Sequence, residues 1–149
     1  MINLNFISAE IFISVSIMFL LILGVFKKNS SSLIHNLSIG LLLITGILIL
    51  NNYPDKSLTF FANSYIIDTL SSLMKIFTVI GGALVLSISK KYLKISNIFL
   101  IEYPILILCS ILGMMVMISS NDLIVFYIGL ELQSLALYVL ASFNRDQLK

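Results

Sequence analysis

The chain has 149 residues, of which 59% are hydrophobic and only 11% are charged. A soluble domain carries about 25% charged residues, so this surface has too little charge to face water everywhere, and we expect lipid to cover much of it. The net charge of +2 is too small to indicate a nucleic-acid partner. The single cysteine, Cys109, lies in an apolar run and is expected to pack as a small apolar side chain.

Five apolar segments are long enough to cross a membrane as helices, which takes about 20 residues each. The first is followed by two lysines, the second by the turn NNYPDKS, and the third by KKYLK. The fourth begins at Pro104, and the fifth follows Asn121 and Asp122, which stand where a helix cap is expected. No strand pattern, linker or internal repeat is found. The expected spans cover about residues 6–26, 33–50, 65–89, 104–120 and 123–143.

The sequence therefore predicts an all-α polytopic membrane protein that forms a single membrane domain. Basic residues fix its expected orientation, because they favour the inner side of a membrane. Lys56 falls on one side of the five spans and Lys75 lies within the third. The remaining basic residues all fall on the other side: Lys27, Lys28, Lys90, Lys91, Lys94, Arg145 and Lys149. The N-terminus is therefore predicted outside and the C-terminus inside.

Three ionisable residues, Asp68, Lys75 and Glu131, lie within or just inside the expected spans. A charge near the bilayer centre costs about 2.5–3.5 kcal/mol on insertion scales, so such residues indicate function. Asp68 and Lys75 are one heptad apart and share a helix face. A structural role and a functional role are equally compatible with that pattern. A lone histidine, His35, is expected to serve as a hydrogen-bonding or interfacial residue.

Glu131 is the strongest candidate, because it lies about eight residues, or roughly 12 Å, into the fifth span. At 100° per residue the hydroxyls of Tyr127, Ser134, Tyr138 and Ser142 fall on its side of the helix, and Gln133 points roughly the other way. Such a stripe can hold water and relay a proton. The alternative is a protonated glutamate that only hydrogen-bonds a neighbouring helix.

Glycines in the third and fourth spans, Gly81, Gly82 and Gly113, permit close approach of helices and are interpreted as packing features. No zinc-protease, nucleophile-elbow, CxxC or dinucleotide-binding motif is present, so the chain is predicted to bind no metal and no redox cofactor.

The last third of the chain carries a family resemblance. The stretch ILGMMVMISSNDLIVFYIGLELQSLALYVLASFNRD, and within it SSNDL followed by GLELQSLALYVL, closely resembles subunit 2 of respiratory complex I, the proton-pumping NADH:ubiquinone oxidoreductase. IIDTLSSLMKIF and AEIFISVSIMFLLILGVF resemble the same subunit less distinctively. The resemblance covers the N-terminal portion of that antiporter-like subunit.

The resemblance implies a membrane-arm subunit that contributes part of a proton path, has no catalytic activity alone, and assembles with other membrane-arm subunits. Glu131 matches the glutamate that this family uses in its fifth helix. The family pairs that glutamate with a lysine two helices later, so Lys75 is not that lysine, and a role for it in the path stays a possibility. A second polypeptide is expected to supply the helices that follow.

The N-terminus MINLNFISAE has neither the basic start of a signal peptide nor the arginines of a transit peptide. With the residue bias of an AT-rich genome, this favours a mitochondrially encoded protein of the inner membrane, with the bacterial plasma membrane as the alternative. Two other functions stay open. One is a subunit of an Mrp-type cation/proton antiporter or a membrane hydrogenase, and the other is a structural scaffold without a proton path.

Overall fold

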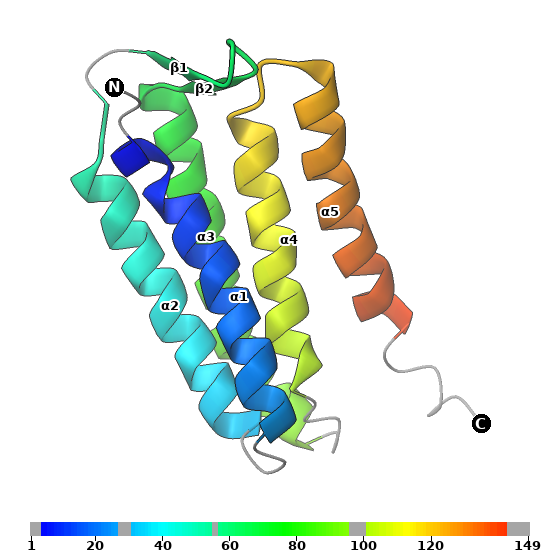
Figure 1. The fold of residues 1–149 in the computed structure, drawn as a ribbon. Coiled ribbons are helices and arrows are strands. Elements are labelled where there is room, and N and C mark those ends of the chain that lie inside the picture. Colours follow the sequence, from blue (N-terminus) through cyan, green and yellow to red (C-terminus); the bar gives the residue numbers. More distant parts are fainter. Residues whose placement is uncertain (1–3, 27–30, 55–56, 96–100, 143–149) are drawn as a thin grey trace.

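The computed structural model of the chain describes residues 4–26, 31–54, 57–95 and 101–142 (Figure 1). Within these ranges the chain is dominated by long helices, as predicted. A short 3-10 helix, η1 (Leu4–Ile7), leads into the first of them. The helices are α1 (Ser8–Phe26), α2 (Ser31–Asn51), α3 (Thr69–Ile95), α4 (Glu102–Ile118) and α5 (Leu123–Ser142).

Helices α1 to α4 form a bundle, and α5 lies on its outside against α4 (Figure 1). The bundle shares one apolar core, with Leu20, Leu42, Leu86 and Met115 each contributed by a different helix and each fully buried. In α5, by contrast, the buried residues are the small Gly129 and Ala136. The fifth helix therefore packs mainly against α4 through one narrow face, and Val125 near its start also contacts the cluster at the hairpin.

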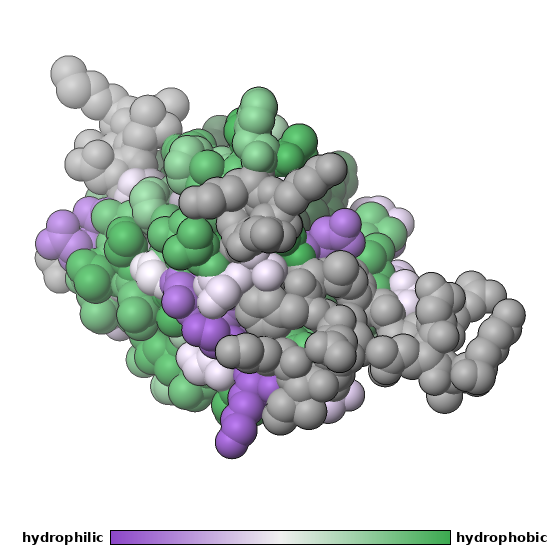
Figure 2. Space-filling model, turned by 90° about the horizontal axis from the view of Figure 1, so that it is seen from below, coloured by the Kyte–Doolittle hydropathy of each residue, from purple (hydrophilic) through white to green (hydrophobic). Residues whose placement is uncertain are grey.

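The outward-facing side chains of the helices are mostly large and apolar, as in Val25, Ile88 and Ile124. A view from the end opposite the hairpin shows hydrophobic residues along the visible flanks (Figure 2). Four helices, α1, α2, α3 and α5, are long and apolar enough to cross a membrane. Helix α4 is equally apolar but has 17 residues, about 25 Å at the helical rise, which is the short end of the spanning range.

The sequence reading was wrong about strands and about the start of the third span. Strand β1 (Leu58–Phe60) pairs with β2 (Tyr65–Ile67) in an antiparallel hairpin, with Thr59 opposite Ile66. Residues expected to begin a helix at 65 are thus a strand, and α3 starts at Thr69. Only Asp68 and Thr69 separate the apolar Tyr-Ile-Ile from the apolar part of the helix, so hydropathy did not distinguish the two elements.

The hairpin turn has an unusual backbone conformation, which is a second reason why the sequence did not predict the hairpin. Phe61, Ala62 and Asn63 have φ of 51°, 53° and 71°, the left-handed region that normally calls for glycine. Asn121 stabilises this turn, because its side-chain amide donates to the carbonyl of Asn63 at 2.7 Å. The turn sequence contains no Asn-Gly or Asp-Gly, which are the usual signals of a hairpin. Tertiary contacts such as this one stabilise the turn instead.

The orientation set by the basic residues gives a testable topology. Lys91 lies near the end of α3, opposite the hairpin that carries Thr59, and both are exposed. Five of the basic residues used for the prediction lie outside the described residues: Lys27, Lys28, Lys56, Arg145 and Lys149. Single cysteines replacing Lys91 or Thr59, in a Cys109→Ser background, should react with a membrane-impermeant maleimide from opposite sides of sealed vesicles. Labelling of both from one side would contradict the predicted orientation.

Candidate functional site

Glu131 lies where the sequence predicted, in the middle of the fifth helix. It is the ninth residue of α5, about 12 Å along a helix of 20 residues. Asp122 caps this helix, since its carboxylate accepts the N–H of Ile124 at 3.4 Å, and Phe126 then donates to the Asp122 carbonyl at 3.0 Å. The expected cap is confirmed, and it fixes where α5 begins and how deep Glu131 lies.

The packing of α5 turns Glu131 away from the bundle. Helices α4 and α5 meet through Gly113 and Gly129: a Cβ at Gly113 would lie 2.7 Å from the backbone nitrogen of Gln133, and one at Gly129 would lie 2.8 Å from that of Met117. Two residues along a helix is 200°, so Glu131 projects nearly opposite to both Gly129 and Gln133. The carboxylate therefore lies on the face of α5 that α4 does not cover.

The hydroxyl stripe around Glu131 is present on that open face. Tyr127 and Tyr138 are 61% and 70% exposed, and Tyr127 stands one turn before Glu131 on the same side of α5. The serines behave differently from the prediction. Ser134 donates its hydroxyl to the Glu131 carbonyl at 3.1 Å and Ser142 to the Val139 carbonyl at 2.9 Å, so their protons are directed at the backbone of α5 and not at the carboxylate.

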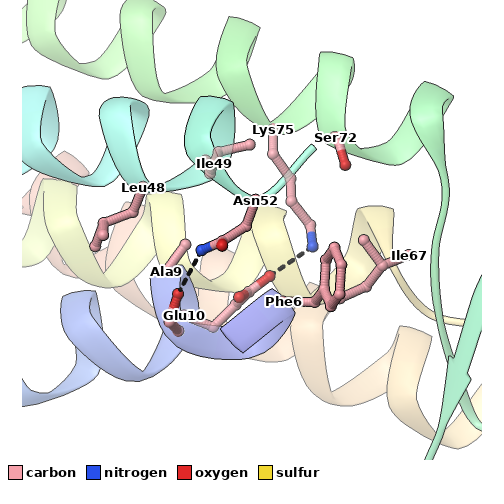
Figure 3. A pocket seen from close by; sticks show the side chains of 10 residues that line it. Phe6, Ala9, Glu10, Leu48, Ile49, Asn52, Ile67, Ser72 and Lys75 are labelled. Carbon is pink, nitrogen blue, oxygen red and sulfur yellow. Dashed lines mark hydrogen bonds and ion pairs between the residues drawn. The ribbon is translucent and has the colours of Figure 1, made fainter. Parts of the chain in front are cut away.

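Lys75 does not join Glu131; it pairs with Glu10 (Figure 3), and Tyr65 completes a separate buried cluster with these two residues. Its Nζ lies 2.5 Å from Glu10 Oε1, and the two side chains are 2% and 8% exposed. The Tyr65 hydroxyl donates to the same carboxylate oxygen at 2.8 Å and accepts from Lys75 at 3.4 Å. The ammonium also lies 5.2 Å from the centroid of the Tyr65 ring, within cation–π range.

Three elements deliver this cluster. Glu10 comes from the first turn of α1, Lys75 from the seventh position of α3, and Tyr65 from strand β2 of the hairpin. Burial, and next the charge of Glu10, raise the pKa of the Tyr65 phenol, so this hydroxyl stays protonated and remains a donor. Removing one member of a buried ion pair costs about 3–5 kcal/mol, because the other charge is left uncompensated.

A small cavity adjoins the pair (Figure 3). Its volume is about 10 Å³, and its lining includes Glu10, Lys75, Ser72, Asn52 and Ser8. The second carboxylate oxygen, Glu10 Oε2, is buried and has no hydrogen-bond partner among the described residues. The cluster therefore contains one unsatisfied acceptor beside a small cavity that polar and apolar side chains line together.

Glu10 and Tyr65 were missed by the sequence reading. Glu10 stands in the first turn of a helix, where a carboxylate is favoured by the helix dipole and draws no attention. The same criterion that singled out Lys75, a charge next to a long apolar run, also applies to Glu10, because the apolar run IFISVSIM follows it. Tyr65 was taken as the start of a span. Only the folded hairpin brings its hydroxyl over the first turn of α1.

The remaining polar candidates have structural roles. Asp68 caps α3 with reciprocal bonds, since its carboxylate accepts the Ser71 N–H at 2.7 Å while Ser71 Oγ accepts the Asp68 N–H at 2.9 Å. His35 is a hydrogen-bonding residue, as expected, with Nε2 2.8 Å from the Leu86 carbonyl of α3. Within the described part of the chain, no three His, Cys, Asp or Glu residues are grouped so as to hold a metal ion. The absence of a cofactor stays a prediction.

The long apolar helices define the class of the protein, which is an all-α, polytopic membrane protein. Among known proteins the chain is 75% identical over 147 residues to NADH-quinone oxidoreductase subunit N of Pelagibacter ubique, a match that covers 99% of this chain and 31% of that protein. It is 46% identical over 141 residues to subunit N of Bartonella bacilliformis, and 41% identical over 137 residues to that of Paramagnetospirillum magneticum. These two matches cover 94% and 92% of this chain and 28% of each relative. No family model matches the chain.

The chain thus spans about a third of the length of the relatives that it matches. They confirm the predicted resemblance at the level of a NADH-quinone oxidoreductase subunit, although they are named subunit N and not subunit 2. The relatives are bacterial, so they support the bacterial alternative and give no support to a mitochondrial inner membrane. A second polypeptide that supplies further helices stays a prediction.

Proposed function

We propose that the chain forms part of subunit N of a bacterial NADH-quinone oxidoreductase and carries part of a proton path through its membrane arm. The observation that carries this is the 75% identity to subunit N of Pelagibacter ubique over 99% of the chain. In this role the chain transfers no electrons. It assembles with the other membrane-arm subunits in the bacterial plasma membrane, surrounded by lipid.

Glu131 is the residue of this chain that we assign to the proton path. A carboxylate in mid-membrane can take a proton from one side and release it to the other, which an alkyl or amide side chain cannot do. Its support is the position of Glu131 on the face of α5 that α4 does not cover, with the hydroxyl-bearing Tyr127 one turn before it. That face has room for the further helices that a longer subunit contributes.

The assembly is tested by purifying the tagged chain from its own membranes in a mild detergent and identifying the proteins that accompany it. We expect other subunits of NADH-quinone oxidoreductase in stoichiometric amounts. A chain of unrelated topology from the same membranes, tagged in the same way, controls for adventitious capture. Recovery of cation/proton antiporter or hydrogenase subunits in their place would reject the proposed assembly.

A further inference from the structure

We propose that Glu10, Lys75 and Tyr65 form a second protonatable site, which binds one water molecule at Glu10 Oε2 and exchanges protons with it. The proposal deepens the proposed function, because it adds a second group to the proton path, and for that part it rests on the proposed function. The site lies toward the hairpin end of the bundle, since Glu10 is only the third residue of α1.

The first step concerns the water. Buried polar atoms are almost always hydrogen-bonded, and one that lacks a protein partner is commonly satisfied by buried water. Glu10 Oε2 is such an atom. A cavity of about 10 Å³ is close to the smallest space that accommodates one water molecule. Ser72 and Asn52 line the same cavity and offer a hydroxyl and an amide as further partners.

The second step concerns access. Ser8 and Asn52 border the cavity, are only partly buried, and are joined by a bond of 3.2 Å from the Asn52 amide to the Ser8 hydroxyl. Lys75 and Ser72 are on its buried side. The cavity therefore extends from the half-buried Ser8 and Asn52, where α1 begins and α2 ends, to the buried Glu10, and apolar side chains such as Leu48 and Ile49 complete its lining.

The third step is the proton exchange. A hydronium ion in the cavity gives its proton to Glu10 Oε2, which leaves a neutral water molecule and a neutral carboxylic acid. The reverse step returns the proton to water and restores the carboxylate. The protonated Glu10 no longer balances the Lys75 ammonium, which keeps the Tyr65 hydroxyl and ring as its neighbours. The Tyr65 hydroxyl orients Glu10 Oε1 in the charged state.

Proton translocation by the assembled complex in sealed membrane vesicles tests the place of this site in the path. The decisive comparison is between Glu10→Gln and the double variant Glu10→Gln with Lys75→Gln. If the ion pair serves only the fold, the single change should reduce stability and translocation, because it leaves the Lys75 charge buried without a partner. The double change should restore both, because it leaves no buried charge. A protonatable site is lost in both. We expect translocation to fall by about tenfold or more in both variants, with the complex still assembled in the double variant.

Glu102→Gln is the matched control, because Glu102 is also in the first turn of an apolar helix but is exposed. It should translocate protons as the unmodified complex does. Restored translocation in the double variant, or normal translocation by an assembled Glu10→Gln complex, would overturn the place of Glu10 in the path.

Infrared spectroscopy of the purified full chain in lipid nanodiscs tests the proton exchange without any NADH chemistry. On acidification we expect a carboxylic acid C=O band that shifts in D2O and is missing from Glu10→Gln but kept in Glu102→Gln. Identical spectra of Glu10→Gln and the unmodified chain would overturn the protonatable site. If the band is present and neither Glu10 nor Glu131 affects translocation, the proposed function fails while the protonatable site stands.

Discussion

Replacement of Glu131 with glutamine is expected to leave the complex assembled but to reduce its NADH-driven proton translocation by about tenfold or more, a barrier increase of about 1.4 kcal/mol or more. Glutamine keeps the shape of the side chain and much of its hydrogen-bonding capacity, but it cannot take up or release a proton. Glu131→Asp keeps the ionisable group on a shorter arm and should lose less. The measurement is the pH change in sealed vesicles for each NADH oxidised.

The alternative role for Glu131 makes the opposite forecast. A protonated glutamate that only hydrogen-bonds a neighbouring helix is mimicked well by glutamine, so Glu131→Gln would then translocate protons normally. Glu102→Gln serves again as the control for loss of an exposed carboxylate. Normal translocation by an assembled Glu131→Gln complex would reject the assignment of this residue to the proton path.

Gly129→Ala is expected to destabilise the chain by about 1–3 kcal/mol, as other overpacked contacts do. The added Cβ would lie 2.8 Å from the Met117 nitrogen and 2.9 Å from the Gly113 carbonyl oxygen. Both are backbone atoms of α4, so a change of side-chain rotamer cannot relieve the clash. Helix α5 must therefore move away from α4 as a whole. The change is measured as the loss of unfolding free energy in detergent and as an increased distance between spin labels on α4 and α5.

Gly81→Ala and Gly40→Ala are the matched controls, because a Cβ at either position has no atom within 4 Å. Both are helical, so alanine should be neutral or stabilising by up to about 1 kcal/mol through its higher helix propensity. Gly113→Ala should behave as Gly129→Ala does, since its Cβ would meet the backbone of Gln133. Equal stability of Gly129→Ala and Gly81→Ala would show that the helices do not meet there.

The membrane class and the long helices could be predicted from the sequence because they depend on local composition. Runs of apolar residues punctuated by lysines, turns and caps such as Asp122 specify helices without reference to distant parts of the chain. The depth of Glu131 and the face it shares with Tyr127 follow from helical periodicity alone. Gly82 and Gly113 are closely packed, as the sequence indicated, whereas Gly81 has open space and Gly129 was not singled out. Which glycines meet another helix depends on how the helices dock, and periodicity does not give this.

The buried pair could not be predicted, because its members are 65 residues apart in the chain. No local pattern links Glu10 with Lys75, and Glu10 by itself has an ordinary explanation in the first turn of a helix. The hairpin was missed for a related reason: its turn adopts left-handed backbone at Phe61, Ala62 and Asn63 without a glycine. Contacts with the segment before α5 stabilise that turn, and these exist only in the folded chain.

Strand β2 makes two distant parts of the bundle mechanically dependent on each other. Its backbone is hydrogen-bonded to the loop between α4 and α5. Ile66 N–H donates to the Ser119 carbonyl at 2.8 Å, and Tyr65 forms an isolated antiparallel β-bridge with Ser120. The side chain of the same Tyr65 is anchored on Glu10. A tilt of α5 at its first turn is thus expected either to break these backbone bonds or to shift the Tyr65 hydroxyl relative to Glu10. The hairpin therefore couples the position of the helix that carries Glu131 to the geometry of the buried pair.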